Sequence, residues 1–158
     1  MTVREYNQSV RRCSDDLNRF ALRYSNFSAA AEDAVQDVFL MLWERRTEVE
    51  VEGVRGYLVR TLYRRLVDLH RHDEVVRRAV PSAPDEAYSQ HNAFELHDAL
   101  SKALAQLPEQ QRALVLLRDL EGWSYADMAA LSGLSEQQVG VYLFRARKTM
   151  KKLLEDYR

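Results

Sequence analysis

Hydrophobic residues recur at helical spacing along most of the chain, and short polar or proline-containing stretches separate the repeats. The pattern predicts a first helix from near Thr2 to Tyr24 and a second that opens after Ser28, whose hydroxyl suits an N-cap. A polar loop over 45–53 precedes a third helix, expected from about Val54 to His72. The inner faces of these helices are expected to carry Tyr6, Val10, Cys13, Leu17, Phe20, Ala21, Val35, Val38, Phe39, Leu42, Trp43, Leu58, Leu62, Leu66 and Leu69. Together the three helices predict one small bundle.

The second half of the chain repeats the helical pattern after a segment that lacks it. Residues 77–91 contain two prolines and several small or polar residues, which is typical of a linker. The periodicity resumes with Phe94, Leu96, Ala99, Leu100, Leu104 and Leu107. We therefore expect an all-α protein of about seven helices, arranged as two small bundles joined by a flexible linker. The expected boundaries are 1–76 for the first module, 77–92 for the linker and 93–158 for the second module.

The segment from Leu107 to Leu154 has the pattern of a helix-turn-helix unit that ends in a long basic helix. A short helix from Tyr125 to Leu131 is expected, followed by a tight turn in which Gly133 can take the positive φ that such a turn requires. Ser135 is the expected N-cap of the long helix. Its buried face should carry Val139, Leu143, Ala146 and Met150, and its outer face Gln138, Gly140, Val141, Tyr142, Arg145 and Lys148. An outer face of this kind fits the major groove of DNA.

Charge is separated along the chain although the formal net charge is only -1. Acidic residues concentrate between Glu32 and Glu52, whereas 55–78 and 145–152 are basic. The basic run at the end of the long helix can neutralise DNA phosphates. A solvated helix end, whose lysines only complement the helix dipole, is the alternative for that run. The distribution of charge therefore bears on DNA binding more than its sum does.

Few features of the chain support a catalytic or metal site. The sequence has no glycine-rich phosphate loop, nucleophile motif or Cys/His cluster, and Cys13 is expected to be a small, half-buried residue. His70 and His72 are two positions apart and do not share a helical face. We therefore expect a protein that is not an enzyme and needs no metal or cofactor. The start lacks a signal-peptide core and no apolar run reaches membrane-spanning length, so we expect a cytoplasmic protein without membrane insertion.

Two motifs in the chain resemble a known family. AEDAVQDVFLMLWERR at 31–46 and VRGYLVRTLYRRLVDLHRH at 54–72 look like region 2 of a bacterial sigma factor, and the chain from Leu107 onward looks like region 4. Sigma factors with these two regions form the extracytoplasmic-function (ECF) group. The resemblance implies a subunit that binds the largest and second-largest subunits of core RNA polymerase, directs the enzyme to promoter DNA and helps open it. It also implies control by an anti-sigma factor that sequesters the free protein.

The resemblance assigns core-polymerase binding to the helix that contains 31–46. The residues that match the family's core-binding positions are Asp33, Gln36, Asp37, Phe39, Leu40 and Trp43. In the family this helix docks on a coiled coil of the largest polymerase subunit. Acidic and amide groups suit a basic partner, and aromatic rings are enriched at interface hot spots. A place in the hydrophobic core is the alternative for Phe39 and Trp43.

The following helix resembles the part of region 2 that contacts the −10 element and captures an unstacked base. The residues assigned to −10 DNA binding are Tyr57, Arg60, Tyr63, Arg64, Arg65 and Arg71, and the matching segment also includes Leu58 and Asp68. Arginines can hold a single-stranded backbone, and aromatic or guanidinium planes can stack on bases. The alternative is a solvated basic face. Arg64 stands where many family members carry asparagine, which leaves the captured base open.

The long basic helix corresponds to the family's −35 recognition helix. The residues assigned to −35 DNA binding are Ser135, Gln137, Gln138, Val141, Tyr142, Arg145, Arg147 and Lys148. Glutamine can pair with adenine, valine can contact a thymine methyl group and arginine can bind guanine. The chain has Gly140, Val141 and Tyr142 where the family commonly shows lysine, serine and arginine. Gly140 is expected to weaken the helix by about 1 kcal/mol relative to alanine, and part of the recognition can rest on DNA shape.

Two alternatives to a sigma factor stay open at the level of sequence. An ordinary helix-turn-helix regulator accounts for the C-terminal half but gives the 31–46 motif and the tyrosine-arginine helix no role. A sigma-like mimic that binds an anti-sigma or other regulatory partner, and no promoter, is compatible with the atypical recognition helix. Binding to core polymerase and to promoter DNA distinguishes the three classes.

Overall fold

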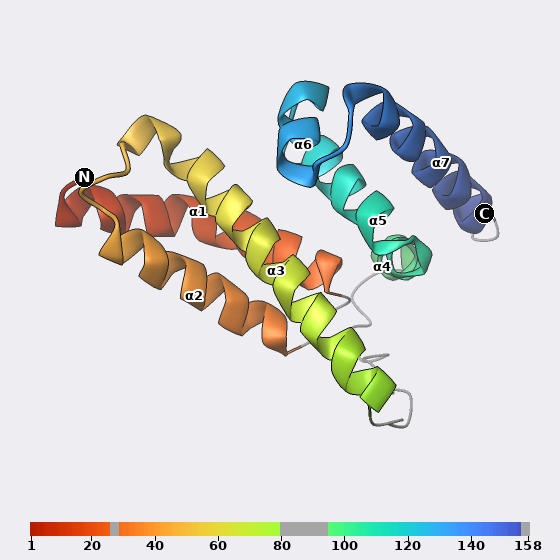
Figure 1. Ribbon diagram of the computed structural model, residues 1–158, viewed down its shortest axis with the longest axis horizontal. Coiled ribbons are helices and arrows are strands. Elements are labelled where there is room, and N and C mark those ends of the chain that lie inside the picture. The colour runs from red at the N-terminus through yellow and green to blue at the C-terminus, as the bar shows by residue number, and fades with distance from the viewer. Residues whose placement is uncertain (26–28, 80–94, 156–158) are drawn as a thin grey trace. The chain divides into compact units, whose positions relative to one another are not determined.

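The structure is a computed structural model that describes the backbone of residues 1–25, 29–79 and 95–155 and the side chains of 1–25, 29–72 and 99–155 (Figure 1). The described residues form helices and turns, with no β-strand among them. The chain divides into two compact units, Met1–Ala87 and Tyr88–Arg158. The expected all-α architecture of two helical parts is therefore confirmed.

The first unit contains three packed helices. They are α1 (Val3–Tyr24), α2 (Ala30–Glu44) and α3 (Val54–Ala79), and a 3-10 turn, η1 (Val51–Gly53), leads directly into α3. Each helix packs against the other two, as Figure 1 shows for the red, orange and yellow-green ribbons. This triangle places α2 and α3 side by side.

A capping box fixes the start of α1 at the residue that the sequence predicts. The Thr2 hydroxyl accepts the Glu5 N–H at 3.1 Å, and the Glu5 carboxylate accepts the Thr2 N–H at 2.7 Å. The predicted cap of α2, Ser28, lies outside the described residues. The residue directly before α2, Ala29, makes no side-chain cap.

Most predicted inner-face residues of the first unit are buried, although Tyr6, Val10 and Leu69 are half-buried. Its largest fully buried side chains are Leu17, Phe20, Tyr24, Val38, Leu42, Leu58 and Leu62. Cys13 is also buried, which corrects the expected half-buried position, because α1 is covered by both other helices. Phe39 and Trp43, by contrast, are only half-buried. The buried face of α2 is thus aliphatic, and its two large rings lie at the edge of the core.

The third helix is longer than the sequence predicts, because it ends at Ala79 rather than near His72. No glycine or proline occurs between Tyr57 and Val80, so nothing in this stretch breaks a helix. Val80 precedes Pro81, and a residue before proline disfavours the α conformation.

Between residues 95 and 155, the second unit contains four α-helices and one wider turn. They are α4 (Glu95–Gln106), α5 (Glu109–Val115), the π-helical turn η2 (Leu116–Leu120), α6 (Tyr125–Ser132) and α7 (Glu136–Glu155). α7 packs against α4, α5 and α6. The buried side chains of this unit are Ala99, Ala103, Leu104, Leu107, Ala113, Leu114, Val115, Leu116, Leu117, Met128, Val139, Leu143 and Ala146. The predicted core positions Phe94 and Leu96 lie outside the described side chains.

Arg112 holds the turn between α4 and α5. Its guanidinium donates hydrogen bonds to the carbonyl oxygens of Leu104, Ala105 and Leu107 at 2.9, 3.1 and 3.1 Å. The last carbonyls of a helix have no partner within the helix, so a cation that binds several of them stabilises the helix end. The end of α4 is thereby fixed to α5 in the second unit.

Candidate functional site

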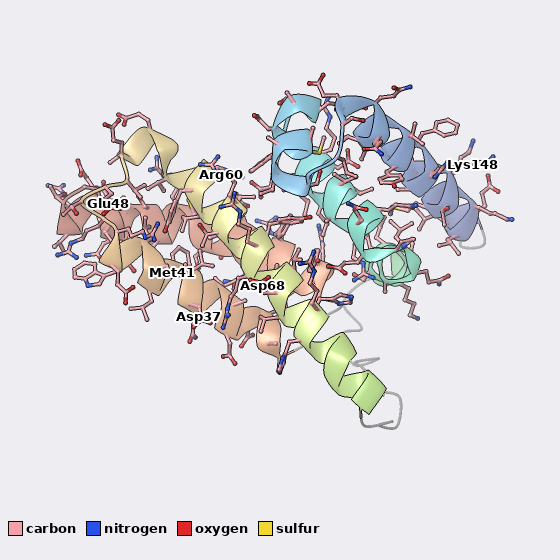
Figure 2. The ribbon with its side chains drawn as sticks, in the orientation of Figure 1. Asp37, Met41, Glu48, Arg60, Asp68 and Lys148 are labelled. Carbon is pink, nitrogen blue, oxygen red and sulfur yellow. The ribbon has the colours of Figure 1, made fainter. Side chains whose placement is uncertain are left out.

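An open groove of about 550 Å³ runs between α2 and α3. Its lining residues are Asp37, Leu40, Met41, Glu44, Arg45, Tyr57, Thr61, Arg64, Arg65 and Asp68. Figure 2 labels Asp37 and Met41 on α2 and Asp68 on α3. The groove therefore brings together residues predicted for two different tasks, polymerase binding on α2 and −10 DNA binding on α3.

Four of the six predicted core-binding residues form one accessible edge of α2. We call this set, Asp33, Gln36, Asp37 and Leu40, the α2 rim. Leu40 is 57% exposed, although leucine usually prefers burial, and Asp33 and Gln36 are exposed as well. Their spacing of three and four residues puts them on one helical face. The α2 rim thus offers two carboxylates and an amide around one exposed leucine.

The other two predicted core-binding residues, Phe39 and Trp43, lie on a different side of α2. The Trp43 ring packs edge-on against Tyr6 with ring centroids 5.0 Å apart, and the Arg46 guanidinium lies 4.0 Å from the Trp43 ring. The Tyr6 hydroxyl donates a hydrogen bond to the Phe39 carbonyl at 2.9 Å. Burial raises the pKa of Tyr6, which keeps this hydroxyl protonated as a donor. These contacts of Phe39 and Trp43 help hold α1 against α2, while both rings keep part of their surface open.

The predicted −10 residues occupy the opposite edge of the groove and the face beside it. We call Tyr57, Arg60, Arg64 and Arg65 the α3 rim. Tyr57 is half-buried in the groove wall, and the three arginines are exposed. Arg60 lies over Gly56, where an added β-carbon would stand 3.1 Å from the Arg60 Nη1 atom. The α3 rim thus puts three cations on accessible positions along one helix.

Three further residues of that segment have different surroundings. Arg71 is exposed beyond the end of the groove lining. Tyr63 is half-buried and meets the buried Tyr24 ring edge-on at 6.3 Å. Leu58 is fully buried and therefore belongs to the core. Among the tyrosines of α3, Tyr57 is thus the one that lines the groove.

An ion pair crosses the groove between the two rims. Arg65 Nη2 lies 3.1 Å from Asp37 Oδ2, and both side chains remain nearly half exposed. A pair this exposed contributes at most about 1 kcal/mol to stability, so it is readily exchanged for other partners. The pair joins a residue predicted to bind polymerase to one predicted to bind DNA.

The helix-turn-helix unit has the turn that the sequence predicts. Gly133 ends α6 with a φ of 77°, in the left-handed region that glycine adopts at little cost. The Ser135 hydroxyl accepts the Gln138 N–H at 3.1 Å, and the Gln138 side-chain oxygen accepts the Ser135 N–H at 2.9 Å. The predicted N-cap is confirmed, and Gln138 completes a capping box that fixes the start of α7.

The outer face of α7 carries most of the predicted −35 residues. Gln137, Gln138, Val141, Arg145 and Lys148 are exposed, and Figure 2 shows Lys148 on the side of α7 turned away from α5 and α6. Besides Ser135 and Gln138 in the capping box, two more predicted residues make contacts within the unit. Arg147 pairs with Asp119 at 3.0 Å, and the half-buried Tyr142 ring lies 6.0 Å from the Arg145 guanidinium.

Sequence reasoning missed two exposed apolar residues at these surfaces. Phe144 on α7 is 69% exposed, and Met41 in the groove is 39% exposed. Helical spacing could have identified both as surface residues, since Phe144 follows Val141 by three positions and Met41 follows Asp37 by four. They were missed because an apolar residue in a helical repeat is normally assigned to the core.

Membrane-spanning and metal-binding features are both absent from the described parts of the chain. No helix there is long and apolar enough to cross a membrane. The same residues contain no group of three or more His, Cys, Asp or Glu side chains suited to a metal ion.

Two family models match the chain. Residues 9–74 match sigma-70 region 2, and residues 97–150 match sigma-70 region 4. The first match covers both rims of the groove, and the second covers the helix-turn-helix unit.

Curated proteins and solved structures give the same result. The chain is 31% identical over 154 residues to the ECF RNA polymerase sigma factor SigM of Mycobacterium tuberculosis, an alignment that covers 94% of this chain and 76% of that protein. The sigma factor RpoE of Bartonella quintana, solved with the anti-sigma factor NepR, matches with a TM-score of 0.80 and 25% identity over 99% of this chain and 100% of that one. CnrH, solved with the cytosolic domain of CnrY, matches with a TM-score of 0.69 and 25% identity over 98% and 90% of the two chains.

Proposed function

The chain belongs to the ECF group of RNA polymerase sigma factors, non-enzymatic subunits that direct transcription initiation, and on this premise we propose which of its surfaces meets which partner. The α2 rim docks on core RNA polymerase, the α3 rim holds the −10 element, and the outer face of α7 reads the −35 element. The observation that carries the assignment of the two rims is the groove that Asp37 and Glu44 line from the α2 side, and Arg64 and Arg65 from the α3 side.

The charges of the two rims support different partners. Asp33, Asp37 and Glu44 give the α2 side three carboxylates, which suit the basic coiled coil of the largest polymerase subunit. Leu40 adds an apolar side chain that gains free energy when an interface covers it. DNA phosphates are attracted by the arginines of the α3 rim. The two partners therefore bind on opposite sides of one groove.

The α3 rim has the side chains that single-stranded DNA requires. Arg60, Arg64 and Arg71 are exposed and follow one another along the same helix at helical spacing. Tyr57 offers an aromatic ring at the groove, where an unstacked base can pack. We propose that the arginines hold the non-template backbone while the groove end near Tyr57 receives the base.

The chain is proposed to use its two units as separate DNA-binding modules. Residues 1–76 form the module for polymerase and the −10 element, 77–92 the connection, and 93–158 the module for the −35 element. The matched family segments, 9–74 and 97–150, support these boundaries because each lies inside one module.

An anti-sigma factor is the proposed regulatory partner. The two solved structures described above each contain a second protein, the anti-sigma factor NepR with RpoE and the cytosolic domain of CnrY with CnrH. The exposed Leu40 and Met41 on α2 give such a protein an apolar area to cover.

The anti-sigma proposal is tested by adding the protein that co-purifies with this chain to a transcription reaction. Suppression that excess chain reverses supports the proposal, whereas co-purification without suppression contradicts it.

The groove assignment is tested with one arginine from the α3 rim. The Arg64→Ala variant should bind core polymerase normally, but its holoenzyme should bind fork-junction DNA with a single-stranded −10 segment several-fold more weakly. The matched control is Arg11→Ala, because Arg11 is an exposed arginine of α1 outside the groove. Equal binding of the fork DNA by Arg64→Ala and wild-type holoenzymes would reject the role of the α3 rim.

A further inference from the structure

The outer face of α7 carries an apolar surface in the N-terminal half of the helix. Phe144 has the largest exposed fraction of the large apolar side chains in the described residues, 69%, and Val141 is 40% exposed. The two residues are three positions apart, so they are neighbours on one helical face. Together they present a phenyl ring and an isopropyl group to solvent at the centre of the predicted recognition surface.

The other residues of this half of α7 leave little capacity for polar readout. The side-chain oxygen of Gln138 already accepts the Ser135 N–H, and Tyr142 is half-buried. From Gln137 to Phe144 the sequence contains no lysine, arginine or histidine. Helix-turn-helix proteins contact bases mainly through the first turns of the recognition helix. Gln137, Val141 and Phe144 are therefore exposed candidates for base contact in these turns.

Gly140 extends the apolar surface toward α6. A β-carbon at Gly140 would stand 3.5 Å from Cε2 of Tyr125, whose side chain is 38% exposed. The glycine therefore leaves the edge of the Tyr125 ring uncovered. Phe144 follows Gly140 by four positions, so the two residues lie on the same side of α7. A lysine at this position, as in many family members, would put an alkyl chain and a charge there instead.

We propose that Val141 and Phe144 read thymine in the −35 element through its C5-methyl group. The inference rests on the proposed function, in which α7 enters the major groove. The thymine methyl is the one apolar group that a base pair exposes in that groove, so an apolar side chain distinguishes thymine from cytosine and from the purines. Burying one methyl group changes a binding constant by about fourfold.

Charge around the surface favours DNA over a protein as its occupant. Arg145, Lys148 and Lys152 are exposed and follow Val141 at spacings that keep them on the same side of α7. An apolar centre flanked by cations complements base edges flanked by phosphates. An apolar protein interface has its charged residues depleted at the core, and its partner would need matching acidic groups here.

The experiment removes only the methyl group from the DNA. Wild-type holoenzyme first selects duplexes from a pool randomised over roughly one helical turn upstream of a start site that it uses. The most enriched duplex is then made with uracil in place of each thymine of that window, which keeps base pairing and deletes C5-methyl groups. Dissociation constants are measured for wild-type, Phe144→Ala and Phe144→Leu holoenzymes, with Leu120→Ala as the matched control because Leu120 is exposed in the same unit but lies on η2.

The proposal predicts a coupling between the residue and the methyl group. Uracil should weaken wild-type and Leu120→Ala binding by about fourfold for each methyl contacted. It should weaken Phe144→Ala binding by a smaller factor than wild-type binding, because only the Val141 contact remains in that variant. Phe144→Leu should keep an intermediate penalty. The exposed position of Phe144 means that the alanine variant should fold normally, as its unfolding curve will show.

Three results would overturn it. The first is an enriched window that contains no thymine. The second is a uracil penalty that is the same for the wild-type and Phe144→Ala holoenzymes. The third is a Phe144→Ala variant that keeps full promoter affinity but loses binding to a protein partner. Transcription by the wild-type holoenzyme from the selected duplex separates these results from a failure of promoter recognition itself.

Discussion

Asp37 is the residue at which the two proposed surfaces meet. Its pair with Arg65 is exposed and contributes little to folding, so its charge is available to a partner. Asp37→Arg should abolish binding to core RNA polymerase, because it reverses a charge on the α2 rim and repels both Arg65 and a basic coiled coil. A pull-down with purified core enzyme measures this.

The matched control for Asp37 is Asp15→Arg, a charge reversal at an exposed position of α1. It should leave core binding unchanged, and both variants should unfold close to the wild-type temperature. Wild-type affinity in the Asp37→Arg variant would remove Asp37 from the interface.

Arg145 should contribute directly to −35 recognition. Arg145→Ala should weaken duplex promoter binding by about 1–3 kcal/mol if the guanidinium binds a guanine, and should lower the salt slope by about 1 if it binds a phosphate. Arg147→Ala is the comparison, and it should lose less because Arg147 must first leave Asp119. A salt titration of promoter binding distinguishes the cases, and coincident curves for Arg145→Ala and wild type would exclude Arg145 from DNA contact.

Single residues were predicted well where helical spacing alone decides exposure. Asp33, Gln36 and Leu40 share an accessible face of α2, as their spacing requires. Phe39 and Trp43 could not be assigned this way, because their half-burial depends on Tyr6 from another helix. The commitment of the Gln138 oxygen to a capping box became apparent only with the geometry of the cap.

At the scale of the element, Gly140 should reduce the stability of α7 and therefore the stability of the second unit. The space at Gly140 accepts a methyl group, since a β-carbon would make an ordinary 3.5 Å contact with Tyr125. Gly140→Ala should therefore raise the free energy of unfolding by up to about 1 kcal/mol. Urea unfolding followed by circular dichroism measures the change.

Gly133 provides the opposite control for Gly140. Its φ of 77° is left-handed, so Gly133→Ala should lower the free energy of unfolding by about 1–2 kcal/mol. The same change in both variants would mean that helix propensity and backbone strain do not govern these positions.

The elements themselves were largely predictable from periodicity and capping residues. Thr2, Gly133 and Ser135 stand where the structure begins or ends a helix. α3 continues to Ala79, although the predicted helix ends near His72 and the predicted linker begins at residue 77. The groove between α2 and α3 depends on how two helices pack, and no local pattern in the sequence encodes that.

At the scale of the whole molecule, the chain gives opposite charge to neighbouring surfaces and keeps its net charge at -1. Acidic groups concentrate on α2, and basic groups concentrate on α3 and at the end of α7. A protein partner and DNA can therefore bind the same small protein without competing for one surface. This arrangement fits a subunit that acts between polymerase and promoter.

The most direct test of this account is run-off transcription with purified core RNA polymerase on fragmented DNA from the source genome, with and without this protein. The account predicts new discrete transcripts that depend on the protein and disappear with Asp37→Arg. Start sites of these transcripts would supply the promoter elements needed to test α3 and α7. The account would be contradicted if the protein bound neither core polymerase nor promoter DNA and the transcripts matched those of core enzyme alone.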